Sequence, residues 1–361
     1  MTDNTWPTVD TELIDDVTLY SAKLIIPVTG PVIIDGAVAI HGDRVVHVGK
    51  RRWVLKALKQ EMTAHGTIHE RHWDGVLTPG LINAHTHLQY SGMVQVGQGT
   101  YDRFRAWELA FNEVYAEAQK TQPWKQWAED GARQMVESGT TAAADIVTDL
   151  DAAGALASQG MHGIAYWEVM GWHNAEWMEK GRTELIRQLR RMNEEQLPNL
   201  GISPHAPYTL ESEPFVDLPD IARQLNMRLH IHLAETPLEA GTYPPVLTTY
   251  SAADWSDHDW ESYRQLKEVG KGASAIQFVD QLGSLGPDVH IAHGVWANGE
   301  DRRILRQRGV GVALCPRSNR ITNTGKDAPV REYLEEGNLV SVGTDSLSST
   351  PTLDLLDDVS M

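Results

Sequence analysis

Two histidines one residue apart, His85 and His87, end an apolar stretch that begins at Pro79. In a β-strand, residues i and i+2 project from the same face, so both imidazoles can point at one site. Imidazole nitrogen is a ligand for zinc and other borderline divalent metals. A His-x-His pair alone is weak evidence, because a structural or incidental pair is the more frequent case. The rest of the chain has to decide between the two.

Other residues of ligand or catalytic type recur at the ends of apolar runs: His205, His230, His232, Glu235, His290, His293 and Asp345. His230 and His232 share a strand face, so either could be a ligand, with the other packed one layer deeper. His290 and His293 cannot share a face, and His293 is better placed because it lies nearer the following turn. The single cysteine, Cys315, excludes a thiolate zinc cluster, which leaves His and carboxylate groups as protein ligands.

These residues need elements that bring them together. Apolar strands are predicted near 79–88, 139–146, 161–170, 200–208, 228–235, 289–295, 309–316 and 339–345. Segments with helical periodicity are predicted between them at 104–119, 124–138, 183–195, 215–225, 262–282 and 302–307. Eight strands alternating with helices predict an α/β fold, a (β/α)8 TIM-like barrel, although an open doubly wound sheet has the same local rhythm. The barrel is favoured because only a closed sheet gathers the ends of all these strands.

The residues before the barrel are predicted to form a small β element. From about residue 14 to residue 78, short apolar runs alternate with Gly and Asp turns, which is typical of antiparallel hairpins. The predicted domains are therefore a β element at 14–78 and a catalytic barrel at 79–361. Residues 240–260 are predicted to be an irregular insertion after the fifth strand, either a lid or a surface excursion.

The amino-acid composition limits the kinds of molecule that the chain is expected to bind. Acidic residues outnumber basic ones by 49 to 31, and the formal net charge of −18 would repel nucleic acid and anionic membranes. No apolar run is long enough for a membrane span, and the polar start of the chain does not resemble a signal peptide. A small molecule is the expected ligand and the cytoplasm the expected location. The oligomeric state stays open, with a homodimer as one alternative.

The strand-end motifs resemble those of the metal-dependent amidohydrolase superfamily, in its cytosine-deaminase-like and chlorohydrolase-like branch. The resemblance rests on the ordered set PGLINAHTH, SPHAPY, HLAET, AHG and GTDS, and it runs from about residue 18 to the last residues. It implies a distorted (β/α)8 barrel with a small β-sandwich and one or two divalent metals. Members usually continue past the eighth strand, so the chain is expected to be truncated at its C-terminal end.

The resemblance also implies a set of roles. Four residues are expected to be metal ligands: His85, His87, His232 and Asp345. Glu235 is expected to be the proton shuttle, and its position three residues after His232 favours that histidine over His230 as the ligand. His293 becomes a catalytic residue beside the attacking water, and Asp345 is shared between metal and water. No lysine ends the fourth strand, where two-metal members carry one, so one divalent metal is expected, zinc or alternatively iron.

The implied reaction is hydrolytic deamination. Metal-activated water attacks a ring carbon, Glu235 moves its proton to a ring nitrogen, and ammonia leaves. Segments 83–89, 314–319 and 344–349 look most like the aminodeoxyfutalosine deaminases of menaquinone biosynthesis, which implies an adenine nucleoside that bears a carboxybenzoyl group. The alternatives are a deaminase of S-adenosylhomocysteine, methylthioadenosine or guanine, an s-triazine chlorohydrolase, and a non-catalytic scaffold.

Three residues are predicted to contact the substrate. His205 ends a strand just before Pro207 and Tyr208, although a capped core histidine is the alternative. Gln89 follows the metal pair and could offer its amide to a purine or ribose. Arg317 could hold a substrate carboxylate through two hydrogen bonds or could pair with a protein carboxylate, and the sequence favours neither.

Overall fold

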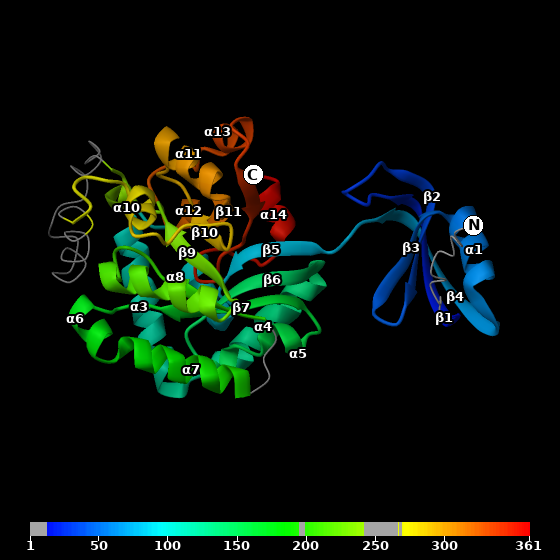
Figure 1. The fold of residues 1–361 in the computed structure, drawn as a ribbon, viewed down its shortest axis with the longest axis horizontal. Helices are drawn as coiled ribbons and strands as arrows, with labels where there is room; N and C mark the ends of the chain where they lie inside the picture. Colours follow the sequence, from blue (N-terminus) through cyan, green and yellow to red (C-terminus); the bar gives the residue numbers. More distant parts are fainter. Residues whose placement is uncertain (1–12, 195–198, 242–265, 267–268) are drawn as a thin grey trace, which may run out of the picture. The chain divides into compact units, whose positions relative to one another are not determined.

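The computed structural model describes residues 13–194, 199–241, 266 and 269–361. The chain divides into two compact units, with the boundary between Gly80 and Leu81 (Figure 1). The insertion predicted at 240–260 lies outside the described residues from residue 242 onward.

The N-terminal unit is one mixed sheet of four strands in the order β3-β2-β1-β4. The strands are β1 (Ile14–Ile25), β2 (Ile33–His41), β3 (Arg44–Lys50) and β4 (Met62–Leu77). Helix α1 (Arg51–Glu61), which the sequence analysis did not predict, connects β3 to β4. Because of this connection β4 pairs parallel to β1, whereas the other neighbouring pairs are antiparallel as predicted.

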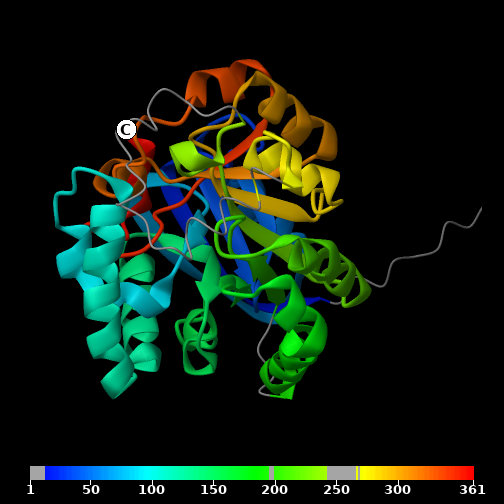
Figure 2. The same cartoon turned by 90° about the vertical axis from the view of Figure 1, so that its left-hand side faces the viewer.

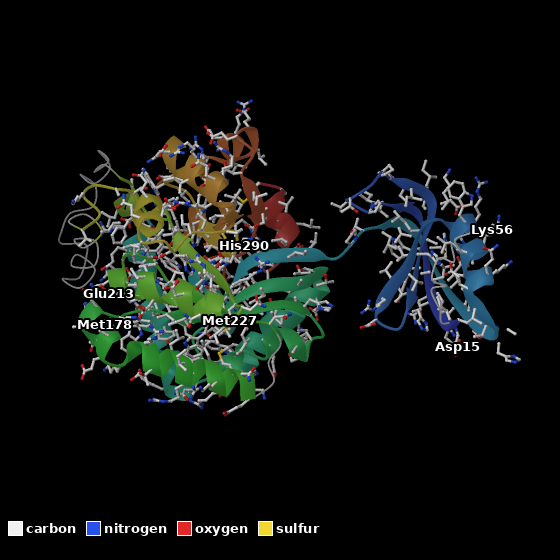
Figure 3. The ribbon with its side chains drawn as sticks, in the orientation of Figure 1. Asp15, Lys56, Met178, Glu213, Met227 and His290 are labelled. Carbon is white, nitrogen blue, oxygen red and sulfur yellow. The ribbon has the colours of Figure 1, made fainter. Side chains whose placement is uncertain are left out.

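Helix α1 closes the core of the N-terminal unit. Its Val54 and Leu58, one helical turn apart, form a buried cluster with Val17 and Leu19 of β1. Lys56, between them in sequence, is exposed on the opposite side of the helix (Figure 3). This apolar spacing explains why a strongly polar segment forms a helix against the sheet.

The second unit contains eight strands that pair in chain order from β5 to β12. The strands are β5 (Leu81–Thr86), β6 (Thr140–Val147), β7 (His162–Val169), β8 (Leu200–Pro204), β9 (Arg228–Leu233), β10 (Val289–His293), β11 (Gly311–Leu314) and β12 (Leu339–Val342). All neighbouring strands pair in parallel. The sheet closes just beyond β12, where the Asp345 N–H donates to the His85 carbonyl and Asp345 bridges Thr86. The predicted TIM-like barrel is therefore confirmed.

Helices lie around the outside of the strands (Figure 2). The longer ones are α3 (Phe104–Thr121), α4 (Trp124–Glu137), α7 (Arg182–Glu194), α8 (Ser212–Gln224), α10 (Ala275–Gln281) and α11 (Gly299–Arg308). Shorter helical segments are η1 (Leu88–Met93), α2 (Val94–Gly97), η2 (Leu150–Ala152), α5 (Ala155–Ser158), α6 (Asn174–Glu176), η3 (Trp177–Gly181), η4 (Pro237–Glu239), α12 (Pro316–Ile321), α13 (Val330–Glu335) and α14 (Leu355–Val359). Among the described helices, none combines the length and apolar character that crossing a membrane requires.

Alternation along the strands separates the core from the site. On β9, Ile231 and Leu233 belong to the large apolar cluster that includes residues of the surrounding helices. His230 and His232, between and beside them, stack or pack against the ring of His85 inside the barrel. The two-residue period of a strand thus sends apolar side chains outward and imidazoles inward.

Candidate active site

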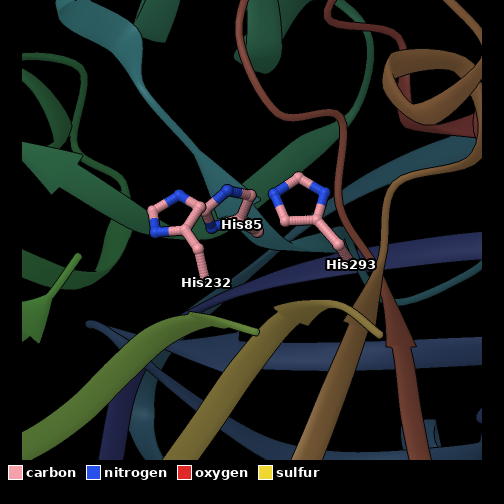
Figure 4. A group of neighbouring side chains, drawn as sticks. All are labelled: His85, His232 and His293. Carbon is pink, nitrogen blue, oxygen red and sulfur yellow. The ribbon is translucent and has the colours of Figure 1, made fainter. Parts of the chain in front are cut away.

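Five predicted site residues converge at the carboxyl ends of the barrel strands. The imidazoles of His85, His232 and His293 come together from β5, β9 and β10 (Figure 4). Nε2 of His87 lies 3.2 Å from Nε2 of His232. Nε2 of His85 and Nε2 of His87 each lie 3.6 Å from Oδ1 of Asp345. The structure therefore brings together the four residues predicted as metal ligands.

Three separations between these ligand atoms are close to those around one tetrahedral ion. Two ligand atoms at about 2.0–2.1 Å from a tetrahedral zinc lie roughly 3.4 Å apart. The observed separations of 3.2 and 3.6 Å lie on either side of that value. Nε2 of His85 is buried and has no hydrogen-bond partner among the described residues. Since buried polar atoms are rarely left unpaired, this nitrogen is available to an ion.

Burial keeps these imidazoles in the neutral form that binds a metal. Desolvation lowers the pKa of His87 to about 4. It also lowers the pKa of His85 and of His232 well below the ordinary value, and the neighbouring imidazoles add to the effect.

Two histidines of the ligand set are oriented from behind. Nδ1 of His85 lies 2.8 Å from Nε2 of His230, which occupies the deeper layer of the barrel. Nδ1 of His232 lies 3.2 Å from the carbonyl oxygen of His205. Contacts of this kind fix the ring and the tautomer of a metal-binding histidine. Of the two alternatives on β9, His232 therefore faces the site and His230 supports it.

The carboxylate of Asp345 is also held in place. Its Oδ2 accepts hydrogen bonds from the hydroxyls of Ser318, at 2.6 Å, and Ser349, at 3.0 Å. Its Oδ1 is left facing the histidines. The sequence analysis did not identify either serine, although both lie within motifs that it compared with the family.

Glu235 and His293 lie beside the ligand set. Nε2 of His293 is 3.5 Å from Oε1 of Glu235, and its Nδ1 is 3.0 Å from Oδ1 of Asn319. The Tyr208 hydroxyl donates to Oε2 of Glu235 at 3.2 Å. Burial raises the pKa of Glu235. Burial lowers the pKa of His293, but the carboxylates of Glu235 and Asp345 outweigh it and raise that pKa. The pair is suited to accept and return a proton.

Three residues of the site have a left-handed backbone. The φ angles are +55° at Ala234, +72° at His293 and +59° at Asp345. This region is uncommon for residues other than glycine, and such residues persist where the surrounding structure holds them. All three follow or end a barrel strand, so the left-handed residues lie in the turns from which the candidate site residues Glu235, His293 and Asp345 project.

The turn after β9 is held by a buried carboxylate, that of Glu239. Its two oxygens accept the backbone N–H groups of Ala234, Glu235 and Thr236 at 2.8, 2.8 and 2.9 Å. Burial raises the pKa of Glu239 to about 7. Glu239 never touches the ligand set in the described contacts, yet it fixes the backbone from which Glu235 projects.

The ligand set lies at the floor of a pocket of about 180 Å³. One wall is a face of α3, where the lining residues follow helical spacing: Phe104, Trp107, Glu108 and Phe111. Tyr90, Tyr208 and His205 complete the aromatic lining. Aromatic walls suit a planar heterocycle, because rings stack or meet edge to face. The sequence analysis placed this helix but did not connect its aromatic stripe with the site.

The three predicted substrate contacts have different outcomes. His205 lines the pocket, and its Nδ1 is paired with the Thr209 hydroxyl at 2.8 Å. Gln89 is 1% exposed, and both ends of its amide are bound by Thr148. It is not among the residues that line the pocket, and its amide ties η1 to the residue that follows β6, so no contact in the structure supports the prediction for Gln89. His290, three residues before His293 on β10, is outside the groups of possible metal ligands in the described chain.

The guanidinium of Arg317 pairs with protein carboxylates, which was the second of the two alternatives for this residue. Nε donates to Asp358, Nη1 to Thr352 and Asp357, and Nη2 to the carbonyls of Thr352 and Asp354. These bonds use all five N–H groups of the guanidinium. The sequence could not show this because Asp358 lies 41 positions away.

Comparison with known proteins places the chain in a family. The model of the amidohydrolase family matches residues 76–243 and 246–361. A 5-methylthioadenosine/S-adenosylhomocysteine deaminase of Moorella thermoacetica is 30% identical over 344 residues, which are 92% of this chain and 70% of that protein. The chain spans between 59% and 70% of the length of the curated relatives it matches. The chain belongs to the amidohydrolase family, and it is an enzyme of the hydrolase class.

Solved structures share the fold. The aminofutalosine deaminase of Helicobacter pylori, in complex with methylthio-coformycin, matches with a TM-score of 0.72 and 20% identity, over 95% of this chain and 80% of that chain. An atrazine chlorohydrolase variant of Arthrobacter aurescens, complexed with zinc and atraton, matches with a TM-score of 0.73 and 20% identity, over 95% of this chain and 75% of that chain. At this identity the likeness shows the barrel fold alone.

Proposed function

We propose that the chain is a metal-dependent hydrolytic deaminase that acts on an adenine nucleoside and releases ammonia. The observation that carries the proposal is the buried Glu235–His293 pair beside four converging ligand side chains, at the floor of an aromatic pocket. The curated relatives support the same chemistry, since they include deaminases named for 5-methylthioadenosine, S-adenosylhomocysteine and 5'-deoxyadenosine.

His85, His87, His232 and Asp345 would hold one divalent ion. Three imidazoles and one carboxylate suit zinc, and iron is the alternative. When bound, the ion supplies the Lewis acidity that makes water a nucleophile near neutral pH. The neutral imidazoles and the two serine bonds to Asp345 prepare the ligands for this role.

Glu235 then carries the protons. It accepts one from the attacking water and donates it to the ring nitrogen next to the amino-bearing carbon, while the new carbon–oxygen bond forms. Glu235 then takes the remaining proton from the new hydroxyl group and passes it to the amino group. The carbon–nitrogen bond breaks, ammonia leaves and the hydroxyl oxygen becomes the carbonyl oxygen. Tyr208 and His293 hold the Glu235 carboxylate from two sides during both transfers. General acid–base catalysis of this kind contributes typically about 10²–10⁴-fold.

The proposed substrate is an adenine nucleoside modified at the 5' position. The names of the relatives favour methylthioadenosine, S-adenosylhomocysteine and 5'-deoxyadenosine. Aminodeoxyfutalosine remains a proposed substrate on motif resemblance alone. Arg317 is paired with Asp357 and Asp358, so it no longer supports a substrate that bears a carboxylate.

A panel assay of purified, metal-analysed protein tests the proposal. The panel contains adenosine, 5'-deoxyadenosine, methylthioadenosine, S-adenosylhomocysteine, aminodeoxyfutalosine, guanine and atrazine, and both ammonia and chloride are measured. We expect metal-dependent ammonia release from at least one adenine nucleoside and neither ammonia from guanine nor chloride from atrazine. Chloride release without nucleoside deamination would make the chain a chlorohydrolase, and no turnover in metal-loaded protein would favour a non-catalytic scaffold.

A further inference from the structure

Glu168, at the C-terminal end of β7, is a buried carboxylate that the proposed reaction does not use. Its side chain is 3% exposed, and its Oε1 has no hydrogen-bond partner among the described residues. It lines the pocket above the ligand set. Burying a carboxylate without a donor is unfavourable, so such a group in a pocket wall indicates a ligand that supplies the donor.

Glu168 is not placed to share the ion. Its Oε1 lies 3.9 Å from Nδ1 of His232, whereas Nε2 is the atom of His232 that faces His87. Because the two nitrogens of an imidazole point to different sides of the ring, Glu168 lies away from the converging ligand atoms. With His205 and His232 it forms a separate group of ligand-type atoms within 4.8 Å of one another. A metal ion bound by this second group is the competing explanation, so the metal content of each variant has to be measured.

The neighbours of Glu168 relate it to the proton shuttle. From β9 towards β7, the pocket is lined by Glu235, then by Tyr208, which donates to it, then by His205 and then by Glu168. The ring of His205 lies 5.5 Å from that of Tyr208. If Glu235 meets N1 of adenine, which lies beside the amino-bearing carbon, the rim of the base runs along this row through C2 and N3. Beyond N3 and C4 lies N9, the ring nitrogen that carries the sugar.

A second cavity lies next to Glu168. Glu168 and Met170 line this cavity of about 280 Å³, which is walled by Trp167, Trp172 and residues of α7. Because the same two residues also line the pocket that holds Glu235, Glu168 lies between the two spaces. A sugar with a 5' substituent needs space of this kind.

We propose that Glu168 is a specificity-determining residue that accepts a hydrogen bond from a sugar hydroxyl of the nucleoside. The inference rests on the proposed function, since the order of groups along the pocket is interpreted with adenine as the base. The oxygens of a glutamate carboxyl group are hydrogen-bond acceptors, and a ribose carries two neighbouring hydroxyl donors. A site built to hydrogen-bond a hydroxyl discriminates strongly against an analogue that lacks it.

The test compares adenosine with 2',3'-dideoxyadenosine in wild-type protein, Glu168→Gln and Glu168→Asp, all with metal content measured. Leaving the buried sugar hydroxyl without its acceptor corresponds to about a 5- to 150-fold drop in kcat/KM. We expect a drop of that size for adenosine in Glu168→Gln and almost no change for dideoxyadenosine. The ratio of the two values within one preparation does not depend on the folded fraction. Glu168→Asp, which keeps the charge, should recover part of the preference.

Glu179→Gln is the matched control, because Glu179 is exposed on η3 and is not among the residues that line either cavity, and it should keep the wild-type ratio. An equal loss for both nucleosides in Glu168→Gln overturns the inference, and so does a loss of bound metal, which would make Glu168 a ligand. If wild-type protein deaminates both nucleosides but Glu168→Gln keeps the ratio, only this inference fails. If wild-type protein deaminates no adenine nucleoside, the proposed function fails and this inference fails with it.

Discussion

Replacing Glu239 with glutamine should impair catalysis although the side chain lies outside the ligand set. The Glu239 carboxylate accepts three backbone N–H groups, one on Oε1 and two on Oε2. A glutamine oxygen can replace only one of these two sites, so its amide group would face at least one N–H donor. An unpaired buried donor costs about 1–3 kcal/mol. We expect the free energy of unfolding to fall by that amount.

The effect on turnover follows from the position of Glu235. Two of the three N–H groups belong to Ala234 and Glu235, and the first of these holds a left-handed backbone. A displacement of about 1 Å at a catalytic group can cost on the order of 10²-fold in rate. Steady-state assays of Glu239→Gln should therefore show kcat lowered by about 10- to 100-fold with metal content and KM unchanged.

Asp301→Asn is the matched control for this prediction. Asp301 is another fully buried carboxylate that accepts a backbone N–H, that of Asn298, and it also accepts from Ser274 and Gln277. It caps α11 and lies outside the pocket lining. Its replacement should cost similar stability and leave kcat near the wild-type value. A kcat loss of the same size in both variants, or a wild-type kcat in Glu239→Gln, would refute the reasoning.

Three further predictions follow from the same contacts. Arg317→Met leaves the buried Asp358 carboxylate without its cation, so the free energy of unfolding should fall by about 3–5 kcal/mol in chemical unfolding. Any drop in kcat/KM should be the same for acidic and neutral nucleosides, and a drop confined to the acidic one would contradict the structural role of Arg317. Glu235→Gln should keep its metal and lose about 10²–10⁴-fold in turnover, and near-normal ammonia release would remove Glu235 from the mechanism. Arg51 holds the pKa of Glu70 at about 2, below its ordinary 4.5, so the pair stabilises the N-terminal unit above pH 4.5 and that stability is lost as the pH falls towards 2. Thermal melts of Glu70→Gln should lack this part of the acid dependence, and an unchanged pH profile would show that the pair does not stabilise the unit.

The barrel and the convergence of the ligand set could be predicted because both depend on local patterns. The two-residue period put His85 and His87 on one strand face, and eight apolar runs marked the strands that the structure confirms. The position of each ligand at a strand end then followed from the geometry of a parallel barrel. Helix α1 was missed because its apolar positions, Val54 and Leu58, stand in a stretch surrounded by hairpin-like runs.

The contacts that support the site could not be predicted, because they join residues far apart in the chain. The hydrogen bonds from Ser318 to Asp345 and from His293 to Asn319 span 27 and 26 positions. The same holds for the engagement of Arg317 at 41 positions. A sequence pattern identifies which side chains can donate or accept, but the partner is decided by how loops pack at the mouth of the barrel.

The central claim, that these four ligands hold an ion needed for deamination, is tested most directly by metal content and ammonia release measured on the same samples. Wild-type protein, His87→Ala and Asp345→Ala would each be stripped with a chelator, reloaded with zinc and assayed with methylthioadenosine and 5'-deoxyadenosine. We expect about one ion per chain and restored ammonia release in wild-type protein, and loss of both in the two variants. Full metal occupancy in both variants, or ammonia release by the stripped wild-type protein, would contradict this claim.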